Sequence, residues 1–213
     1  IHDDLPCMDD DDYRRGKLST HKKFDEATAI LAGDALHDLA YDLMSNNFKN
    51  INFRSNLKAI NYLSLCLGHK GLAFGQALDL EFENKKINKN RILNMYLNKT
   101  GKLFEFCFAA PFMLSNQKID KVNFAKEYGL IFGLIFQIVD DFIDVTGSFK
   151  KIGKTPGKDI KQGKSTLSKL IGRDEALDLC NKKINNFKKK YKLYLRSNEI
   201  LIEIIIYGLK RMN

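Results

Sequence analysis

The sequence contains no tryptophan and only three prolines among its 213 residues, and it has no long apolar run. A membrane-spanning helix needs about 20 mostly apolar residues, so we expect no stable membrane insertion. The four cysteines, Cys7, Cys66, Cys107 and Cys180, are far apart in the chain and form no CxxC pair. This pattern is typical of small hydrophobic residues in a reducing compartment, and it predicts a cytoplasmic protein.

The charge balance is basic, because 35 lysines and arginines outnumber 26 aspartates and glutamates to give a net charge of +9. Such an excess would suit nucleic acid or an anionic surface. The acidic residues are clustered, however, whereas the lysines are spread along the chain, as in NKKINNFKKKYK at 181–192. Spread lysines are typical of a solvated helix face, so we expect no nucleic-acid partner.

Apolar residues recur every three or four positions, and no region shows the alternation that predicts strands. The pattern predicts helices over 24–44, 55–83, 91–115, 120–146, 174–196 and 198–211. With 44% hydrophobic residues and no break in composition, residues 1–213 are predicted to form a single all-α domain. One irregular stretch, 147–166, holds four glycines and six lysines and is predicted to be a mobile basic loop.

Aspartates crowd the start of the chain, IHDDLPCMDDDDYRRGK, with six of them between positions 3 and 12. Carboxylates this close repel one another, and each tends to take up a proton unless a cation shares the site. A second group, QIVDDFIDV at 137–145, lies in an otherwise apolar stretch, where surface solubility cannot explain it. Both groups therefore predict a bound cation.

Helical geometry gathers the second group on one face. Asp140 and Asp144 are four residues apart, so about 40° separates them around a helix axis. Gln137, three residues before Asp140, faces nearly the same way and can hydrogen-bond a ligand that the carboxylates hold. Asp141 is expected to point elsewhere, in a supporting position behind the groups that contact the ligand.

In the first group, the backbone must bend before two carboxylates can face the same cation. Asp3 and Asp9 are six residues apart, and an unbroken helix would turn them about 240° from each other. Pro6 removes a backbone donor and pushes Leu5 away from helical angles. We therefore expect the chain to fold Asp9 back beside Asp3.

Clustered carboxylates without nearby cysteine or histidine ligands suit hard cations. Few protein ligands favour Mg²⁺, which completes its coordination shell with water and phosphate oxygens. A calcium EF-hand does not fit, because neither group has the central glycine and the final glutamate of that loop. Acidic helix N-caps remain an alternative for one or two of the aspartates.

Several cationic and hydroxyl groups add phosphate-binding capacity. Arg14 and Arg15 offer planar guanidinium groups, while Lys99 and Thr100 are expected to interrupt the helix over 91–115. The GKST segment at 163–166 is not a P-loop, because its spacing from the preceding glycine is wrong and no strand precedes it. These residues predict a polyanionic ligand.

Six segments together resemble the trans-isoprenyl diphosphate synthases: DDLPCMDDDDYRRGK, AILAGDAL, GQALDLEFE, NKTG, FQIVDDFIDVTG and GKTPGKD with GKST. The resemblance spans residues 1 to about 170 and is strongest to the bacterial farnesyl diphosphate synthases. It implies a helical bundle with a central active-site cavity. The same resemblance implies a homodimer.

The resemblance also implies roles for individual residues. Three Mg²⁺ ions, or Mn²⁺ in their place, would be held by Asp3, Asp4, Asp9, Asp140 and Asp144. The allylic diphosphate would be bound by Arg14, Lys99, Thr100, Gln137 and Lys154. The catalytic set would be Asp3, Asp9, Asp140, Lys99 and Lys154. Arg15 would contact the diphosphate of isopentenyl diphosphate, Lys164 would close the site, and Gln76 and Asp79 would line the cavity.

The implied reaction is head-to-tail (1'-4) condensation of dimethylallyl or geranyl diphosphate with isopentenyl diphosphate, which yields farnesyl diphosphate. Geranylgeranyl diphosphate synthesis is an alternative. A terpene synthase or a non-catalytic partner subunit are further alternatives.

Two features of the family are expected upstream of Ile1. One is a segment that completes the isopentenyl diphosphate site, and the other is a set of side chains that control product length. We therefore expect N-terminal helices to precede the chain.

Overall fold

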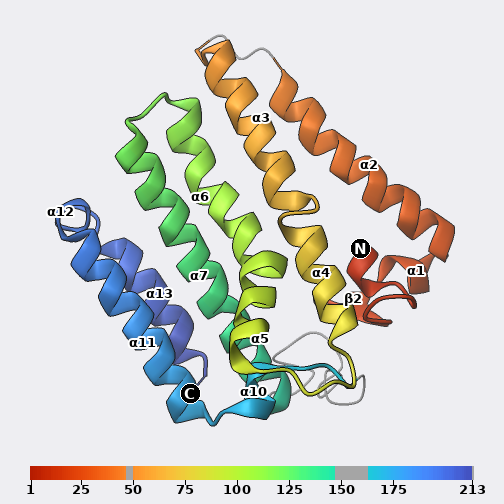
Figure 1. The fold of residues 1–213 in the computed structure, drawn as a ribbon. Helices are drawn as coiled ribbons and strands as arrows, with labels where there is room; N and C mark the ends of the chain where they lie inside the picture. The colour runs from red at the N-terminus through yellow and green to blue at the C-terminus, as the bar shows by residue number, and fades with distance from the viewer. Residues whose placement is uncertain (47–49, 147–162, 213) are drawn as a thin grey trace.

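The computed structural model describes residues 1–46, 50–146 and 163–212, which are mostly helical (Figure 1). The longer helices are α2 (Glu26–Ser45), α3 (Phe53–Leu67), α4 (Leu72–Glu81), α5 (Lys89–Tyr96), α6 (Lys102–Leu114), α7 (Ile119–Thr146), α11 (Arg173–Lys190) and α13 (Ile200–Lys210). The short elements are a 3-10 helix (His2–Asp4), strands β1 (Tyr13–Arg14) and β2 (Lys17–Leu18), α1 (Thr20–Lys23), a π-helical turn (Leu97–Gly101), α10 (Leu167–Leu170) and α12 (Lys192–Leu195). The predicted all-α fold is confirmed.

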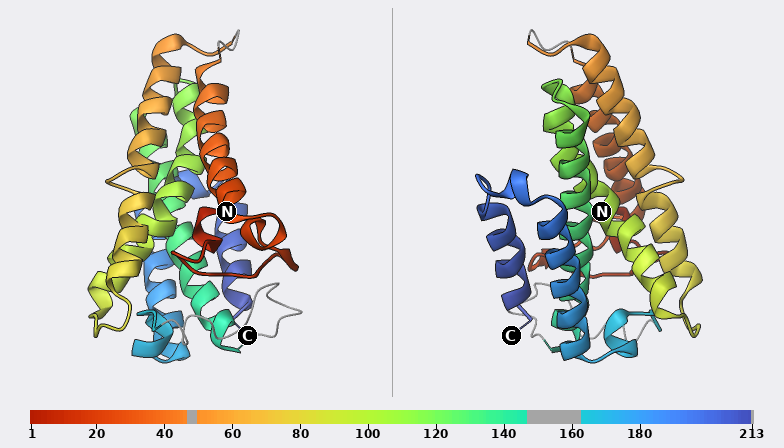
Figure 2. Two further views of the ribbon diagram at one scale, coloured as in Figure 1. Left: turned by 90° about the vertical axis from the view of Figure 1, so that its right-hand side faces the viewer. Right: turned by 60° about the vertical axis from the view of Figure 1, so that its left-hand side comes forward.

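Helix α7 is central to the bundle. It packs against α6 on one side and against α11 and α13 on the other, while α3 packs on α6 (Figure 1). Helix α2 lies at the outer edge beside α3, and the 3-10 helix packs on α2 (Figure 2). The core between α7 and the C-terminal helices includes Tyr128, Phe187 and Ile205, none more than 2% exposed.

A close approach between α7 and the start of α6 sets the position of the second acidic group. A Cβ added at Gly133 would lie 2.7 Å from the Cα of Gly101, so only glycine lets the two backbones come this near. The next turn of α7 carries Gln137 and Asp140. The contact therefore places these side chains beside the π-helical turn.

Two of the predicted helices are divided in the structure. The helix expected over 55–83 is broken between Leu67 and Leu72, where Gly68 has extended backbone angles (φ −79°, ψ −152°). The helix expected over 91–115 contains the π-helical turn Leu97–Gly101, so the predicted interruption at Lys99 and Thr100 is confirmed. The break falls at GHKG, residues 68–71, where two glycines and two polar residues interrupt the apolar spacing and could have indicated it.

All four cysteines are free; Cys66 and Cys180 are buried, whereas Cys7 and Cys107 are exposed. Burial raises the pKa of the Cys180 thiol to about 12, so this group stays protonated at neutral pH. Of the helices in the described ranges, none combines the length and the apolar character needed to cross a bilayer. The cytoplasmic location and the single-domain organisation stay predictions.

Candidate active site

A cavity of about 410 Å³ opens between the first acidic group, α4, the π-helical turn and α7. Its walls include ten of the residues predicted for the site: Asp3, Asp9, Arg14, Gln76, Asp79, Lys99, Thr100, Gln137, Asp140 and Lys164. These residues come from segments separated by up to 161 positions. The fold therefore brings both acidic groups and the predicted phosphate-binding residues to one cavity.

Four predicted residues are placed differently. Asp4, Arg15 and Asp144 are not among the residues that line the cavity. Asp4 is 2% exposed and accepts hydrogen bonds from the Arg14 guanidinium, with 2.8 Å between Arg14 Nε and Asp4 Oδ1. Asp4 therefore fixes the orientation of the Arg14 side chain. Lys154, and the part of the predicted mobile loop that covers 147–162, lie outside the described residues. The ligand roles given to these residues stay predictions.

The bend predicted in the first acidic group is present. The 3-10 helix ends at Leu5, whose backbone is extended (ψ 154°), as expected for the residue before Pro6. The amide of Asp9 then donates a hydrogen bond of 2.9 Å to the carbonyl of Asp3. The two aspartates predicted to work together are therefore neighbours in space.

Two lysines lie among the cavity carboxylates. Lys99 Nζ donates to Asp79 Oδ2 at 2.7 Å and lies 3.8 Å from Asp3 Oδ1. Lys164 Nζ donates to the same Asp79 oxygen at 3.1 Å and also to Asp9 Oδ1. Positive and negative groups thus alternate across the site.

Electrostatics in the cavity favour a cation next to the first acidic group. Burial raises the pKa of Asp3 and the nearby Asp9 carboxylate raises it further, whereas Lys99 opposes the shift. The Oδ1 atom of Asp3 is buried and accepts no hydrogen bond in the described part of the chain. A divalent cation at this oxygen would supply the missing partner and would favour the ionised carboxylate.

On the α7 side, a chain of hydrogen bonds fixes the polar groups. Thr100 Oγ1 donates to Gln137 Oε1 at 2.7 Å, and Gln137 Nε2 donates to Asp141 Oδ1 at 3.2 Å. Asp141 also accepts bonds from the Tyr96 hydroxyl and from the Leu167 amide, the latter at 3.1 Å. The buried Asp141 carboxylate therefore joins α5, α7 and α10.

Asp141 corrects an expectation. We predicted that it points away from the face of Gln137, yet its carboxylate bonds Gln137 and lines the cavity. Positions four apart on a helix are neighbours, so the spacing from Gln137 could have indicated this contact. Tyr96, which sequence reasoning also missed, carries no comparable signal, because its partner lies 45 positions away.

The remaining wall of the cavity is apolar and includes Leu103, Phe104 and Phe136. The rings of Phe104 and Phe136 are 5.4 Å apart and tilted by 48°. A cavity that combines charged groups with aromatic and aliphatic side chains suits a ligand with an anionic head and a hydrocarbon tail.

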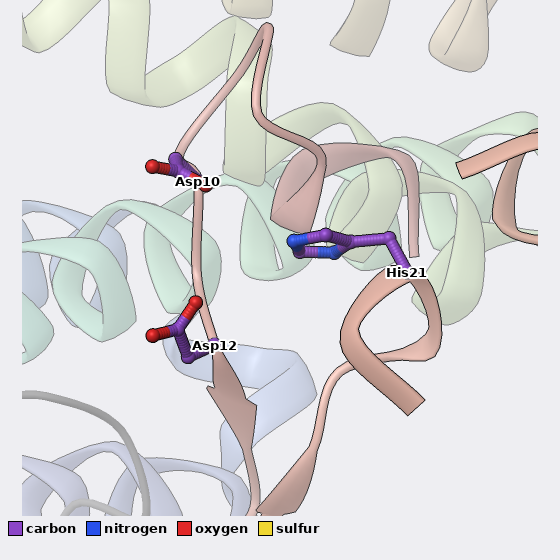
Figure 3. A group of neighbouring side chains, drawn as sticks. All are labelled: Asp10, Asp12 and His21. Atoms are coloured by element: carbon purple, nitrogen blue, oxygen red, sulfur yellow. The ribbon is translucent and has the colours of Figure 1, made fainter. Parts of the chain in front are cut away.

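A smaller cluster lies outside the cavity lining. Among the described residues, Asp10, Asp12 and His21 form the only group of three or more histidine, cysteine, aspartate or glutamate side chains whose possible metal-ligand atoms all lie within 4.8 Å of one another. Figure 3 shows the His21 imidazole directed toward the two aspartates. Lys22 Nζ lies 3.0 Å from Asp12 Oδ1, so an ammonium group already neutralises part of this cluster. We assign it no role in the reaction.

Comparison with known proteins gives a consistent result. A family model described as polyprenyl synthetase matches residues 1–196. Farnesyl diphosphate synthase of Micrococcus luteus is 41% identical over 211 residues, which cover 99% of this chain and 72% of that protein. The Bacillus subtilis enzyme of the same name is 38% identical over 177 residues, covering 83% of this chain and 60% of that protein. The chain thus spans less than two thirds of the Bacillus protein.

Solved structures agree with the sequence comparison. A geranyltransferase from Helicobacter pylori, complexed with magnesium and isoprenyl diphosphate, superimposes with a TM-score of 0.83 at 32% identity. The match covers 98% of this chain and 67% of that one. An FPP/GFPP synthase from Zymomonas mobilis superimposes with a TM-score of 0.82 at 33% identity, covering 97% and 70% of the two chains.

Proposed function

Since the chain belongs to the polyprenyl synthetase family, we propose that it is a prenyltransferase that condenses an allylic diphosphate with isopentenyl diphosphate. Farnesyl diphosphate is the proposed product, because the curated relatives at about 40% identity carry that name. The observation that supports the proposal most strongly is the meeting of Asp3, Asp9 and Asp140 with two lysines in one cavity. Geranylgeranyl diphosphate synthesis remains a minor alternative, favoured by plant relatives of 35% and 38% identity.

The donor set fits Mg²⁺. Asp3 and Asp9 supply hard oxygen ligands from the start of the chain and Asp140 supplies one from α7, and no cysteine lines the cavity within the described ranges. We propose that these three carboxylates hold up to three Mg²⁺ ions, with Mn²⁺ as a possible substitute. Bound Mg²⁺ would stabilise the negative charge that builds on the departing diphosphate.

The chain's own cations would complete the diphosphate site. Lys99 and Lys164 place ammonium groups in the cavity, and Asp4 holds the Arg14 guanidinium in a fixed orientation. Thr100 donates its single hydroxyl proton to Gln137 Oε1, so it must exchange this bond in order to donate to a phosphate oxygen. Arg15 is exposed and does not line the cavity, so its proposed contact with isopentenyl diphosphate would be made from the cavity rim.

The proposed reaction begins with cleavage of the allylic C–O bond, whose electron pair leaves with the diphosphate. The double bond of isopentenyl diphosphate then attacks the allylic carbocation and forms the new C–C bond. The resulting cation loses a proton to an oxygen of the released diphosphate. The apolar wall formed by Leu103, Phe104 and Phe136 would keep water from the carbocation.

A condensation assay tests the proposal. Purified protein is incubated with Mg²⁺, geranyl diphosphate and radiolabelled isopentenyl diphosphate, and the dephosphorylated products are separated by chain length. We expect labelled farnesol, and no reaction when either substrate is left out. Release of hydrocarbon from geranyl diphosphate alone would identify a terpene synthase instead. Activity that requires an added partner protein would identify a non-catalytic subunit.

We further propose that the protein forms a homodimer through the outer face of α2. The helix exposes five large apolar side chains, Ile30, Leu31, Leu36, Leu39 and Leu43. All of them except Ile30 lie within about 140° of one another around the helix axis and form the outer face. Helix α2 lies at the edge of the bundle, where a second copy can reach it (Figure 2). An exposed apolar stripe of this kind is typical of a subunit interface.

Charge on that face is expected to separate the subunits. Leu31 is 67% exposed, so Leu31→Asp leaves the monomer fold intact but buries a carboxylate in the proposed interface. Light scattering at micromolar concentration should report a dimer for the unmodified protein and a monomer for the variant. Leu193→Asp on α12, at a residue 74% exposed, is the matched control and should remain dimeric. A monomeric unmodified protein would contradict the proposal.

A further inference from the structure

We propose that Asp79 is a positioning residue whose single carboxylate holds both Lys99 and Lys164 toward the centre of the cavity. On this view Asp79 binds neither metal nor diphosphate. The claim that the held lysines bind diphosphate rests on the proposed function of the same site. The claim that Asp79 holds the two lysines is independent of that function, because it concerns the protein alone.

The geometry of the contact carries the proposal. Both lysines donate to the same oxygen, Asp79 Oδ2, at 2.7 Å from Lys99 and 3.1 Å from Lys164. The distance between the two ammonium nitrogens therefore cannot exceed the sum of these two bond lengths. Two like charges at such close range repel each other strongly unless an anion lies between them. Asp79 is that anion.

Burial makes this counterion necessary. The side chains of Asp79 and Lys164 are 7% and 6% exposed, and that of Lys99 is 18% exposed. Burial alone would raise the pKa of Asp79, yet the two lysines together lower it below the ordinary value of an aspartate. The geometry therefore places two largely buried ammonium groups on one buried carboxylate oxygen.

The three residues come from separate parts of the chain. Asp79 lies in the last turns of α4, Lys99 in the π-helical turn, and Lys164 in the segment that leads into α10. Each lysine also reaches one aspartate of the first acidic group, Lys99 with Asp3 and Lys164 with Asp9. Among the described residues, Asp79 is thus the only carboxylate that accepts a hydrogen bond from both lysines.

This arrangement gives Asp79 a specific task when the site is filled. Asp3 and Asp9, as proposed metal ligands, would no longer be available to the lysines. Asp79 would still hold both ammonium groups, since its own oxygen is already occupied by them. The lysines would then face the diphosphate with no need to find a new anchor, which lowers the ordering cost of the reaction.

Two substitutions and a control test the proposal. Asp79→Asn keeps the shape but removes the charge, whereas Asp79→Glu keeps the charge on a longer side chain. Glu81→Gln lies two residues further on the same helix, and its exposed carboxylate pairs only weakly with Arg91 at 3.5 Å. This control should behave like the unmodified protein.

The first readout is chemical labelling of the metal-free proteins. Lysines are acetylated briefly with an amine-reactive ester, and mass spectrometry compares Lys99 and Lys164 with the exposed Lys58 as an internal reference. In Asp79→Asn we expect labelling of both cavity lysines to rise about tenfold relative to Lys58, since a buried charge-assisted bond is lost. Asp79→Glu should restore most of the protection. Equal labelling in Asp79→Asn and the unmodified protein would overturn the proposal.

The second readout separates turnover from binding. Asp79→Asn should lower kcat about 10- to 100-fold through misplacement of the lysines. Its affinity for Mg²⁺ with inorganic diphosphate should weaken less than that of Asp3→Ala, because the proposed metal ligands stay in place and only the lysines are displaced. If that affinity falls as far as in Asp3→Ala, Asp79 is a metal ligand and the proposal is wrong. Suppose that Asp79→Asn raises the labelling of both lysines but the unmodified protein catalyses no condensation. This result would support the positioning role and count against the proposed function.

Discussion

Replacing Asp3 with alanine is expected to lower the rate of condensation by about a thousandfold or more while the helical fold persists. The reason is that Asp3 lies beside Asp9 and presents a buried oxygen that accepts no hydrogen bond from the residues that the structure describes, at the place where a cation is needed. Asp140→Ala should have a comparable effect, because it removes the carboxylate that α7 contributes to the same cavity. Measurement of kcat and KM with geranyl and isopentenyl diphosphates, with circular dichroism as a check on folding, would test this.

The same substitution should leave the stability of the metal-free protein unchanged or raise it. Burial raises the folded-state pKa of Asp3 above its unfolded value. An acid of this kind costs stability once the pH rises above the unfolded pKa, so its removal relieves that cost at neutral pH. The rise in melting temperature that Mg²⁺ and diphosphate produce in the unmodified protein should disappear, because the variant no longer binds them.

Asp38→Ala is the control for this experiment. The Asp38 side chain is 88% exposed on α2, and the alanine variant should keep both activity and the ligand-induced stabilisation. Near-normal turnover in Asp3→Ala would show that the first acidic group does not hold the metal. A large loss of stability without ligand would show that Asp3 has a structural role instead.

Gly75→Ala is expected to destabilise the fold by about 3 kcal/mol and to abolish diphosphate binding. A Cβ at this position would lie 2.0 Å from the backbone nitrogen of Lys99 and 2.4 Å from its Cα. No rotamer change can relieve a clash with backbone, so α4 and the π-helical turn must move apart. That movement would carry Lys99 and Thr100 away from the cavity.

Urea unfolding measures the effect on stability, and calorimetry measures the effect on binding of inorganic diphosphate with Mg²⁺. Gly208→Ala in α13 is the matched control, because no atom lies within 4 Å of a Cβ added there. It should stabilise the protein by up to about 1 kcal/mol, since alanine is the better helix former. If the two variants behave alike, the close approach at Gly75 does not hold the π-helical turn in place.

Local chemistry explains which parts of the site could be predicted from the sequence. The effect of Pro6 on Leu5 is a property of neighbouring residues, and the bend that returns Asp9 to Asp3 follows from it. The facing of Gln137 and Asp140 likewise follows from helix geometry. Contacts of this kind depend on a few positions of known spacing.

The long-range contacts of the cavity could not be predicted in the same way. Asp79 and Lys164 are 85 positions apart, and nothing in their spacing indicates that they meet. The bond from Tyr96 to Asp141 depends on how α5 packs against α7, which apolar periodicity does not determine. The family resemblance placed Asp79 in the cavity, but only the packed structure shows that it faces two lysines rather than a substrate group.

The most direct test of the central claim is a calorimetric titration of the protein with inorganic diphosphate, with Mg²⁺ present and with Mg²⁺ removed by chelation. The claim is that the two acidic groups and the cavity lysines bind diphosphate through a shared metal. It predicts binding about 100-fold weaker without Mg²⁺, since the carboxylates then repel the anion. Equal affinity in the two conditions would contradict the account, because the lysines alone would then suffice to bind diphosphate.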